Sequence, residues 1–292
     1  MHAPDLYQAV TDKIIAKLEQ GRIPWKHFSF APLSDPKNLV SGKPYRGINY
    51  LLLSNHPRFA APWWLTYRQA AGRGGHVKKG EHGEPVVFWK FVETLDRETG
   101  GVKQIPLLRH YTVFNVEQCE GVEYPKGEVD PREAQPIAAA EAIEAGMPNP
   151  PRIVIDDIPK AHYSPAQDLV RMCSARHCVS DERYHETLLH ELIHSTGHAK
   201  RLNRFAEEGT THEFGSTTYA AEELVAEIGA AFLCARAGIF QAVEDNAAAY
   251  IAGWLGKLRN DKALVVRAAG KAQKAAAWIL NEEAVTKQET EG

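Results

Sequence analysis

The chain contains few cysteines, and none of them forms a CxxC pair. Four cysteines occur among 292 residues, at positions 119, 173, 178 and 234. Paired CxxC motifs would indicate a zinc ribbon or a thiol redox site, and many cysteines would indicate a secreted, disulfide-stabilised domain. We therefore expect reduced, mostly buried thiols in a cytoplasmic protein. We discount the short spacing from Cys173 to Cys178 as a metal or disulfide signal.

Long apolar runs are also missing from the sequence. A helix that crosses a membrane needs about 20 consecutive apolar residues, and no run of that length occurs. The N-terminus lacks the apolar segment of a signal peptide, and there is no low-complexity stretch or internal repeat. These absences predict a globular protein with no membrane partner, long enough to bury two cores.

Charge is divided unevenly along the chain. Residues 1–110 contain sixteen Lys and Arg against nine Asp and Glu, a balance of +7; because the whole chain carries −3, the remainder carries −10. A basic first third joined to an acidic remainder indicates two modules with different partners. Between them lies a stretch rich in proline, glycine and charge. We predict domains over 1–125 and 151–292, joined by a linker over 126–150.

The first module is predicted to be mixed α+β. Apolar residues at helical spacing indicate a helix over 6–18, and shorter helices are expected over 48–54 and 66–71. Runs of β-branched and aromatic residues over 85–92 and 107–116 predict an antiparallel hairpin. The second module is predicted to be mostly helical, so the expected fold class is α+β.

Residues 190–194 read His-Glu-Leu-Ile-His in a segment with helical periodicity. Positions four apart lie on one face of a helix, so His190 and His194 can present two imidazoles to one metal ion. Glu191 stands beside them, placed to take a proton from the attacking water. These residue types suit zinc, although another divalent ion such as Mn²⁺ stays open.

A third ligand is expected from a second helix further along the chain. Glu223 and Glu227 are again four residues apart. Their spacing favours Glu223 as the ligand and Glu227 as the acceptor of the second ring N–H of a ligand histidine. Glu222 is a rival, but a helix projects it about 100° away from Glu223, so only one of the two can face the metal.

This pattern resembles the gluzincin metallopeptidases, whose third ligand is the first acid of an E-x-x-x-D/E helix. The resemblance implies that His190, His194 and Glu223 are ligands and that Glu191 is the general base. The implied reaction is peptide hydrolysis, and amidases use similar parts. Zinc deaminases use a PCxxC motif, which is absent from this sequence.

Two residues near the motif have open roles. His198 could be a third ligand, but Gly197 is expected to end the helix before it. We favour a role for His198 in orienting the ligands or contacting substrate. Tyr219 lies one turn before Glu223 and could donate a hydrogen bond to a developing oxyanion. It could equally be a half-buried core tyrosine, and we retain it as a candidate catalytic residue.

Aromatic and cationic residues are interleaved in the first module. Unpaired bases stack on aromatic rings while cations follow the phosphates, so this mixture is typical of a surface for single-stranded nucleic acid. The tryptophans could also be core residues, and Lys78 and Lys79 could form a solvated turn. The candidate DNA contacts are Lys43, Tyr45, Arg46, Asn49, Trp64, Tyr67, Arg68, Arg73, Lys78, Lys79 and Lys90.

Both modules resemble parts of one known family. Residues 43–49, 64–70, 75–81 and 85–90 resemble the N-terminal single-stranded-DNA-binding domain of ArdC-type antirestriction proteins, which also occurs in conjugative-plasmid primases. Residues 190–198 and 219–227 resemble the zincin-like domain that follows it in that family. The resemblance covers nearly the whole chain, in the right order.

The resemblance implies a protein of a mobile genetic element. It would bind single-stranded DNA and help incoming plasmid DNA to survive host restriction, with a host restriction or repressor protein as a potential peptidase substrate. One alternative is a DNA-binding protein that protects by occlusion and has a structural or vestigial metal site. Another is a regulatory protease stimulated by DNA. Glu191 argues against a purely structural site, because structural zinc needs no base and usually has four protein ligands.

Overall fold

The computed structural model describes residues 5–26, 35–54, 58–95, 101–126, 135–157, 160–207, 217–239 and 247–282. For residues 89–92, 95, 102–108, 217 and 247 it describes the backbone. The chain combines helices and sheets, as the α+β prediction requires. No helix within the described ranges is long and apolar enough to cross a membrane.

The first module is built on a four-stranded sheet in the order β1-β2-β5-β4. Its strands are β1 (Lys37–Asn38), β2 (Trp63–Thr66), β4 (Glu84–Leu95) and β5 (Val102–Asn115). A separate pair joins β3 (His76–Val77) to β6 (Cys119–Glu120), beyond the one-turn helix η1 (Val116–Gln118).

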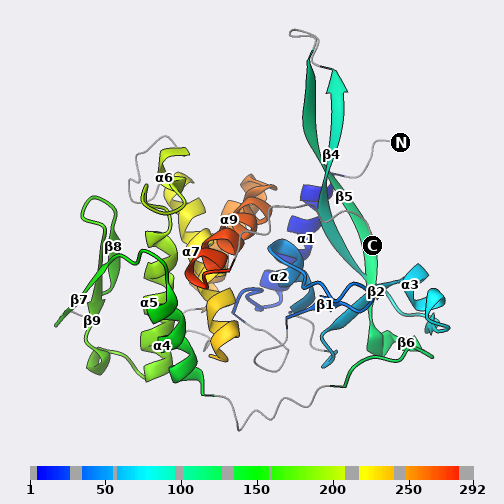
Figure 1. Ribbon diagram of the computed structural model, residues 1–292, viewed down its shortest axis with the longest axis horizontal. Helices are drawn as coiled ribbons and strands as arrows, with labels where there is room; N and C mark the ends of the chain where they lie inside the picture. Colours follow the sequence, from blue (N-terminus) through cyan, green and yellow to red (C-terminus); the bar gives the residue numbers. More distant parts are fainter. Residues whose placement is uncertain are drawn as a thin grey trace.

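The predicted antiparallel hairpin is present and longer than expected. The pairing of β4 with β5 runs without interruption from Glu84 opposite Val113 to Leu95 opposite Val102. Only the base of β5 also pairs with β2, in register from Trp64 to Thr66. The rest of the hairpin projects from the body of the molecule as a two-stranded arm (Figure 1).

Three helices accompany this sheet, close to their predicted positions: α1 (Leu6–Glu19), α2 (Ile48–Ser54) and α3 (Tyr67–Gly72). The Asp5 side chain caps α1 by accepting from the Gln8 N–H. The Thr66 side chain caps α3 in the same way. Buried residues of α1, from Val10 to Leu18, follow the helical period that predicted it.

The second module contains helices and a small sheet. Helix α4 (Pro136–Gly146) precedes it, inside the predicted linker, and its own helices are α5 (Asp181–Ser195), α6 (Arg204–Glu207), α7 (Thr217–Ala237), α8 (Ala247–Asn260) and α9 (Leu264–Ile279). Strands β7 (Arg152–Asp156), β8 (His162–Ser164) and β9 (Leu169–Cys173) form a sheet in the order β7-β9-β8. A one-turn helix, η3 (Ala175–His177), leads from β9 toward α5. These short strands were not predicted, because β7 lacks a regular apolar alternation.

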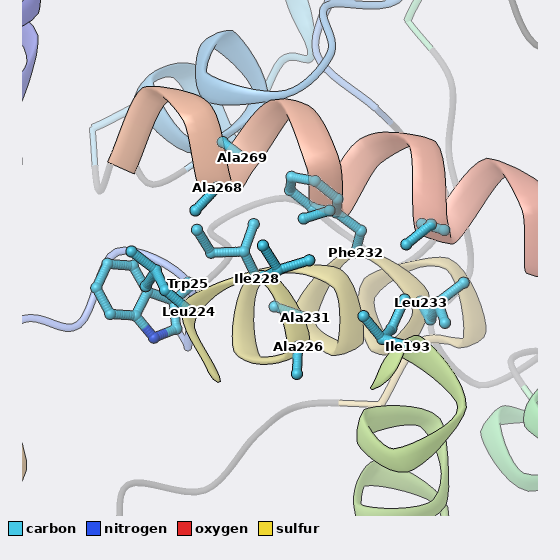
Figure 2. Packing of buried hydrophobic residues seen from close by; sticks show 14 of the residues in the cluster. Trp25, Ile193, Leu224, Ala226, Ile228, Ala231, Phe232, Leu233, Ala268 and Ala269 are labelled. Atoms are coloured by element: carbon cyan, nitrogen blue, oxygen red, sulfur yellow. The ribbon is translucent and has the colours of Figure 1, made fainter. Parts of the chain in front are cut away.

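The largest apolar core joins the two modules. It includes residues of α1 and α2 together with α5, α7, α8 and α9. Trp25, which follows α1, is fully buried and belongs to the same apolar cluster as Leu224 of α7 (Figure 2). The Trp25 ring packs edge-on against Trp254, and its Nε1 donates to the Tyr250 hydroxyl oxygen at 2.9 Å. The core therefore contains residues from both sides of the predicted linker. The N-terminal segment thus helps to position the helix that carries Glu223.

The helices α5 and α7 approach closely at one glycine. A Cβ atom added to Gly229 of α7 would lie 2.7 Å from Cδ1 and 2.9 Å from Cγ1 of Ile193. Ile193 is fully buried on α5, one position before His194. The absence of a side chain at residue 229 thus sets the distance between these two helices.

We expect Gly229→Ala to push α5 away from α7. Overpacking of this kind costs about 1–3 kcal/mol of folding free energy, and it should also weaken metal binding because the two helices carry the candidate donors. Denaturant unfolding and a metal titration measure both effects. The matched control is Gly256→Ala on α8, where nothing lies within 4 Å of an added Cβ. That change should stabilise the protein by about 0.5–1 kcal/mol. Equal stabilisation by both substitutions would contradict the packing argument.

Candidate metal centre

Helix α5 carries the HExxH sequence, and its start and end are defined by local chemistry. The Ser180 side chain accepts from the Arg183 N–H, and Asp181 and Glu182 place negative charge in the first turn. After the last turn, the predicted stop at Gly197 has a packing reason. A Cβ there would lie 2.4 Å from the ring of Phe205, so a side chain at residue 197 would displace that ring from its place over this helix end.

Three donor atoms converge between α5 and α7. The Nε2 atoms of His190 and His194 are 3.1 Å apart. The two carboxylate oxygens of Glu223 lie 3.7 Å from His190 Nε2 and 3.6 Å from His194 Nε2. These donors all fall within 4.8 Å of one another, the one such grouping of His, Cys, Asp or Glu among the described residues.

The donor set fits a divalent metal ion. Two nitrogens bound to one tetrahedral zinc, each at about 2.0–2.1 Å, would lie about 3.3 Å apart, close to the separation of the two Nε2 atoms. Two imidazoles and a carboxylate are ligands that zinc and related ions accept. The arrangement leaves further coordination positions for a water molecule or a substrate.

The structure separates the two rival acids of α7. Glu223 faces both imidazoles, whereas Glu222 points to the other ring nitrogen of His194, with 3.3 Å between Nδ1 and Oε1. Glu222 is also buried against Arg204, whose Nε donates to its Oε2 at 3.1 Å. A carboxylate at Nδ1 favours the tautomer that leaves Nε2 of His194 available to a metal.

Glu227 lies close enough to His190 for its charge to act on that ring, and its role as acceptor of a ring N–H stays a prediction. Its charge, together with those of Glu191 and Glu223, acts on His190. Burial in a site shared with Glu227 strongly raises the pKa of Tyr250, whose hydroxyl accepts from Trp25. At His194, the acid beside the second ring nitrogen is Glu222.

A cavity of about 460 Å³ opens beside the three donors. Glu191 and Tyr219 line it together with residues of β8 and the ring of Phe205. Burial and a hydrogen bond to Glu223 raise the pKa of Tyr219 to about 12, so its hydroxyl keeps its proton at neutral pH. The predicted base and the predicted oxyanion donor therefore share one cavity with the donor atoms.

His198 lies apart from the three donors. Its Nδ1 accepts from the Lys200 N–H at 3.2 Å and is 3.8 Å from Asp168. It belongs to the turn after α5 and is not one of the residues that line the cavity. These contacts favour a structural role for His198.

The charges of the site favour a protonated His190 and an ionised Glu223. Burial alone would lower the pKa of His190, but a hydrogen bond to Glu223 and the charges of Glu191 and Glu227 raise it to about 8. Burial would raise the pKa of Glu223, but the two histidines lower it to about 2. Glu223 is therefore ionised throughout the neutral range.

The predicted DNA contacts divide into buried and exposed residues. Tyr45, Asn49 and Trp64 have 5%, 4% and 0% of their surface exposed. Asn49 exchanges hydrogen bonds with the backbone of Val87, and Trp64 packs edge-on against Phe59. A side chain with no open face cannot stack on a base, so burial gives these three residues a packing role instead.

Arg46 faces the other module, where it forms an ion pair with Glu282 at 3.4 Å. The side chain of Lys90 lies outside the described residues. The remaining candidates are exposed: Lys43, Tyr67, Arg68, Arg73, Lys78 and Lys79. Tyr67 has 60% of its surface accessible, which is high for an aromatic residue.

Two features of this region were missed by the sequence reasoning. One is Arg204, which no spacing relates to the HExxH segment. The other is the pair Cys173 and Cys178, whose Sγ atoms lie 3.6 Å apart although their spacing was discounted. Both thiols are free. In each case the chain turns back on itself to bring the side chains together, and the periodicity of apolar residues does not predict such a turn.

Comparisons with known proteins agree with this two-part architecture. Residues 4–114 match the family model described as the N-terminal domain of anti-restriction factor ArdC. Residues 141–271 match the family of zincin-like metallopeptidases. The protein thus has an ArdC-type N-terminal domain followed by a zincin-like metallopeptidase domain.

Relatives and solved structures show the family of the whole chain. Antirestriction protein ArdC from plasmid R388 is 37% identical in its metal-free crystal structure, with a TM-score of 0.73 over 96% of this chain and 100% of that one. Its Mn(II)-bound structure matches with a TM-score of 0.73, at 36% identity and 97% and 100% coverage. The chain belongs to the ArdC family of antirestriction proteins.

Two further relatives match this chain over most of its length. The uncharacterized protein y4eC of Sinorhizobium fredii is 37% identical over 94% of this chain and 91% of its own length. A DNA primase TraC of Escherichia coli is 34% identical over 94% of this chain, but this chain spans only 20% of that primase. The architecture therefore also occurs as one part of a much longer protein.

Metal binding should depend on pH through His190. A ligand imidazole must be neutral, so below its pKa of about 8 each bound metal ion displaces a proton. We expect the apparent affinity to fall about tenfold per pH unit below that value and to level off above it. Glu223, with a pKa of about 2, adds no dependence in this range.

Calorimetric titration with Zn²⁺ or Mn²⁺ in buffers of different ionisation enthalpy counts the protons released. His76→Gln, a change at an exposed histidine of β3, should leave the curve unchanged. An affinity independent of pH below neutrality would contradict the expectation.

Proposed function

We propose that this chain is an antirestriction protein that binds single-stranded DNA and has a zinc metallopeptidase site, protecting incoming plasmid DNA from host restriction in the cytoplasm. The convergence of His190, His194 and Glu223 beside Glu191 in one cavity carries the peptidase part of the proposal. Zinc is the proposed native ion, and Mn²⁺ is the alternative, supported by the Mn(II)-bound structure of the R388 relative.

His190, His194 and Glu223 would hold the metal ion, which supplies Lewis acidity toward a substrate carbonyl when bound. Glu191 lines the same cavity and accepts the proton of the attacking water, then returns it to the leaving amine. Tyr219 keeps its proton and donates a hydrogen bond to the oxygen on which negative charge develops. These roles describe peptide hydrolysis without a covalent intermediate.

Strand β8 offers a way to bind an extended peptide. It pairs with β9 on one side, and its position at the end of the strand order leaves the other edge without a partner strand in the described sheet. His162 and Tyr163 of β8 line the cavity. A peptide added along this edge would gain backbone hydrogen bonds and pass beside the donor atoms. The class of substrate we propose is therefore an extended segment of a protein.

The DNA part of the proposal rests on the exposed set around α3. The Arg73 guanidinium reaches the Leu39 carbonyl oxygen at 3.5 Å, which brings α3 next to the loop that carries Lys43. Lys78 and Lys79 follow on the turn after β3. Tyr67 is the aromatic platform of this surface, and the cations around it can follow a phosphate backbone.

This proposed DNA surface and the candidate metal centre lie far apart. Along the longest axis of the molecule, α3 and β6 are near one end, whereas α5 and the β7–β9 sheet are near the other (Figure 1). Bound DNA would therefore leave the cavity open to a protein. A separate host protein, such as a restriction or repressor subunit, is the proposed peptidase substrate.

Glu191→Gln tests the peptidase. We expect the variant to keep metal and DNA binding and to lose cleavage of an unfolded protein substrate by about 10²- to 10⁴-fold, because the proton acceptor is gone. Glu182→Gln, the same change at the exposed start of α5, is the matched control. Transfer of a plasmid into a restricting host is the second readout. Full protection by Glu191→Gln would refute proteolysis as the source of protection and favour occlusion by bound protein.

Tyr67→Ala tests the DNA surface. Loss of one stacked base costs about 1–3 kcal/mol, so the affinity for a fluorescent single-stranded oligonucleotide should fall about 5- to 150-fold. Lys79→Ala should lower the slope of log affinity against log salt by about 0.7, the value for one phosphate contact on a single strand. Lys274→Ala on α9, an exposed lysine outside this surface, should change neither quantity. Unchanged binding by both Tyr67→Ala and Lys79→Ala would contradict a DNA site on this surface.

A further inference from the structure

Arg204 is a buried arginine whose bonds converge on the candidate metal centre. It is 4% exposed and begins the short helix α6, after the chain has turned back over the end of α5. Its Nε donates to Glu222 Oε2 at 3.1 Å, and its Nη2 donates to Glu222 Oε1. The guanidinium thus grips the Glu222 carboxylate with two nitrogens, the geometry that best fixes a planar acid.

The same guanidinium is anchored to the end of the histidine helix. Nη2 also donates to the Ile193 carbonyl oxygen at 3.0 Å, and Nη1 donates to the Thr196 hydroxyl at 2.5 Å. Arg204 therefore connects the last turn of α5, which carries His194, to the acid on α7 that touches His194. A lysine could not make these bonds together, because its single ammonium lacks the planar fork.

Glu222 is the link between this arginine and the metal donors. Its Oε1 lies 3.3 Å from His194 Nδ1, and the residue is 4% exposed. A buried carboxylate with no cation beside it is costly and tends to take up a proton or to move toward solvent. Arg204 offsets that cost, so it keeps a charged acceptor at the ring nitrogen opposite the donor Nε2.

We propose that Arg204 is a positioning residue of the metal centre, which acts through Glu222 to fix the ring orientation and tautomer of His194. The inference rests on the metal centre proposed above. It assigns a metal-site role to a residue outside both the HExxH segment and the glutamate helix. Groups that orient a ligand histidine typically contribute about 10- to 100-fold to metal affinity.

Arg201 provides a matched control, because its acid partner is not the glutamate that contacts His194. It is also buried, at 8% exposure, and its Nε donates to the Ser195 carbonyl oxygen at the end of α5 at 2.6 Å. Its acid partner is Asp168, and it also donates to the Tyr163 hydroxyl at 3.2 Å. Asp168 contacts His198 rather than a candidate ligand. Removal of Arg201 should therefore cost folding stability without loosening His194.

The experiment compares Arg204→Met with Arg201→Met in the full chain. The free energy of unfolding is measured in chelator, and Zn²⁺ affinity by competition with a chromophoric chelator. We expect both variants to lose stability, and only Arg204→Met to bind Zn²⁺ about 10- to 100-fold more weakly. The Co²⁺ absorption spectrum, which reports ligand geometry, should change in Arg204→Met and not in Arg201→Met. Equal losses of affinity in the two variants would overturn the proposal.

A double variant tests the route through Glu222. If Arg204 acts on His194 only through that acid, Arg204→Met combined with Glu222→Gln should bind Zn²⁺ no more weakly than Glu222→Gln alone. Losses that add would mean that Arg204 acts by another route, against the proposal. Should Arg204→Met fail to fold, Arg204→Lys decides, because it keeps the buried charge. Its Zn²⁺ affinity should fall several-fold, and wild-type affinity in this variant would overturn the inference.

The outcomes also separate this inference from the proposed function. Wild-type protein that binds no Zn²⁺, or binds it equally well after His190→Ala, would remove the metal centre itself. Wild-type protein that binds Zn²⁺ through His190, with no loss in Arg204→Met, would leave the centre intact and remove only the role of Arg204.

Discussion

The packing of α7 between α5 and α9 is the constraint on which the rest of the molecule depends. The apolar side of α7 is buried against α9, as Figure 2 shows for Ile228 and Phe232. Its contact with α5 is close because Gly229 has no side chain to keep Ile193 away. Apolar burial supplies the free energy that fixes this helix. Three donors that come from two different helices can meet only while that packing holds.

Polar contacts then fix the orientation of the acids and histidines that the apolar core brings together. Glu222 and Glu223 are neighbours in sequence, yet one faces Nδ1 of His194 and the other faces the two Nε2 atoms. The difference follows from the helical turn of about 100° per residue. Buried carboxylates are costly unless they are paired. Arg204 for the first acid and the two histidines for the second meet that requirement.

The N-terminal module contributes to the fold of the zincin-like domain as well as offering a separate surface. Its Trp25 is buried in the core cluster that includes α7 and donates to Tyr250 of α8. Thr11 of α1 donates to the Lys262 carbonyl oxygen at 2.6 Å. The exposed residues around α3 lie toward the far end of the molecule. One core thus supports two distant surfaces, which we propose as the binding sites for DNA and for a protein.

The sequence by itself determined the local features: the HExxH helix, the helix with Glu223, the α+β class and the β4–β5 hairpin. Each depends on periodicity or on spacing within a single element. It also narrowed the expected third ligand to two neighbouring acids and favoured Glu223. Only the tertiary structure decided which acid faces the imidazoles, that Arg204 holds the other, and that Trp64 and Asn49 are buried. These facts depend on contacts between segments distant in sequence, which no local pattern encodes.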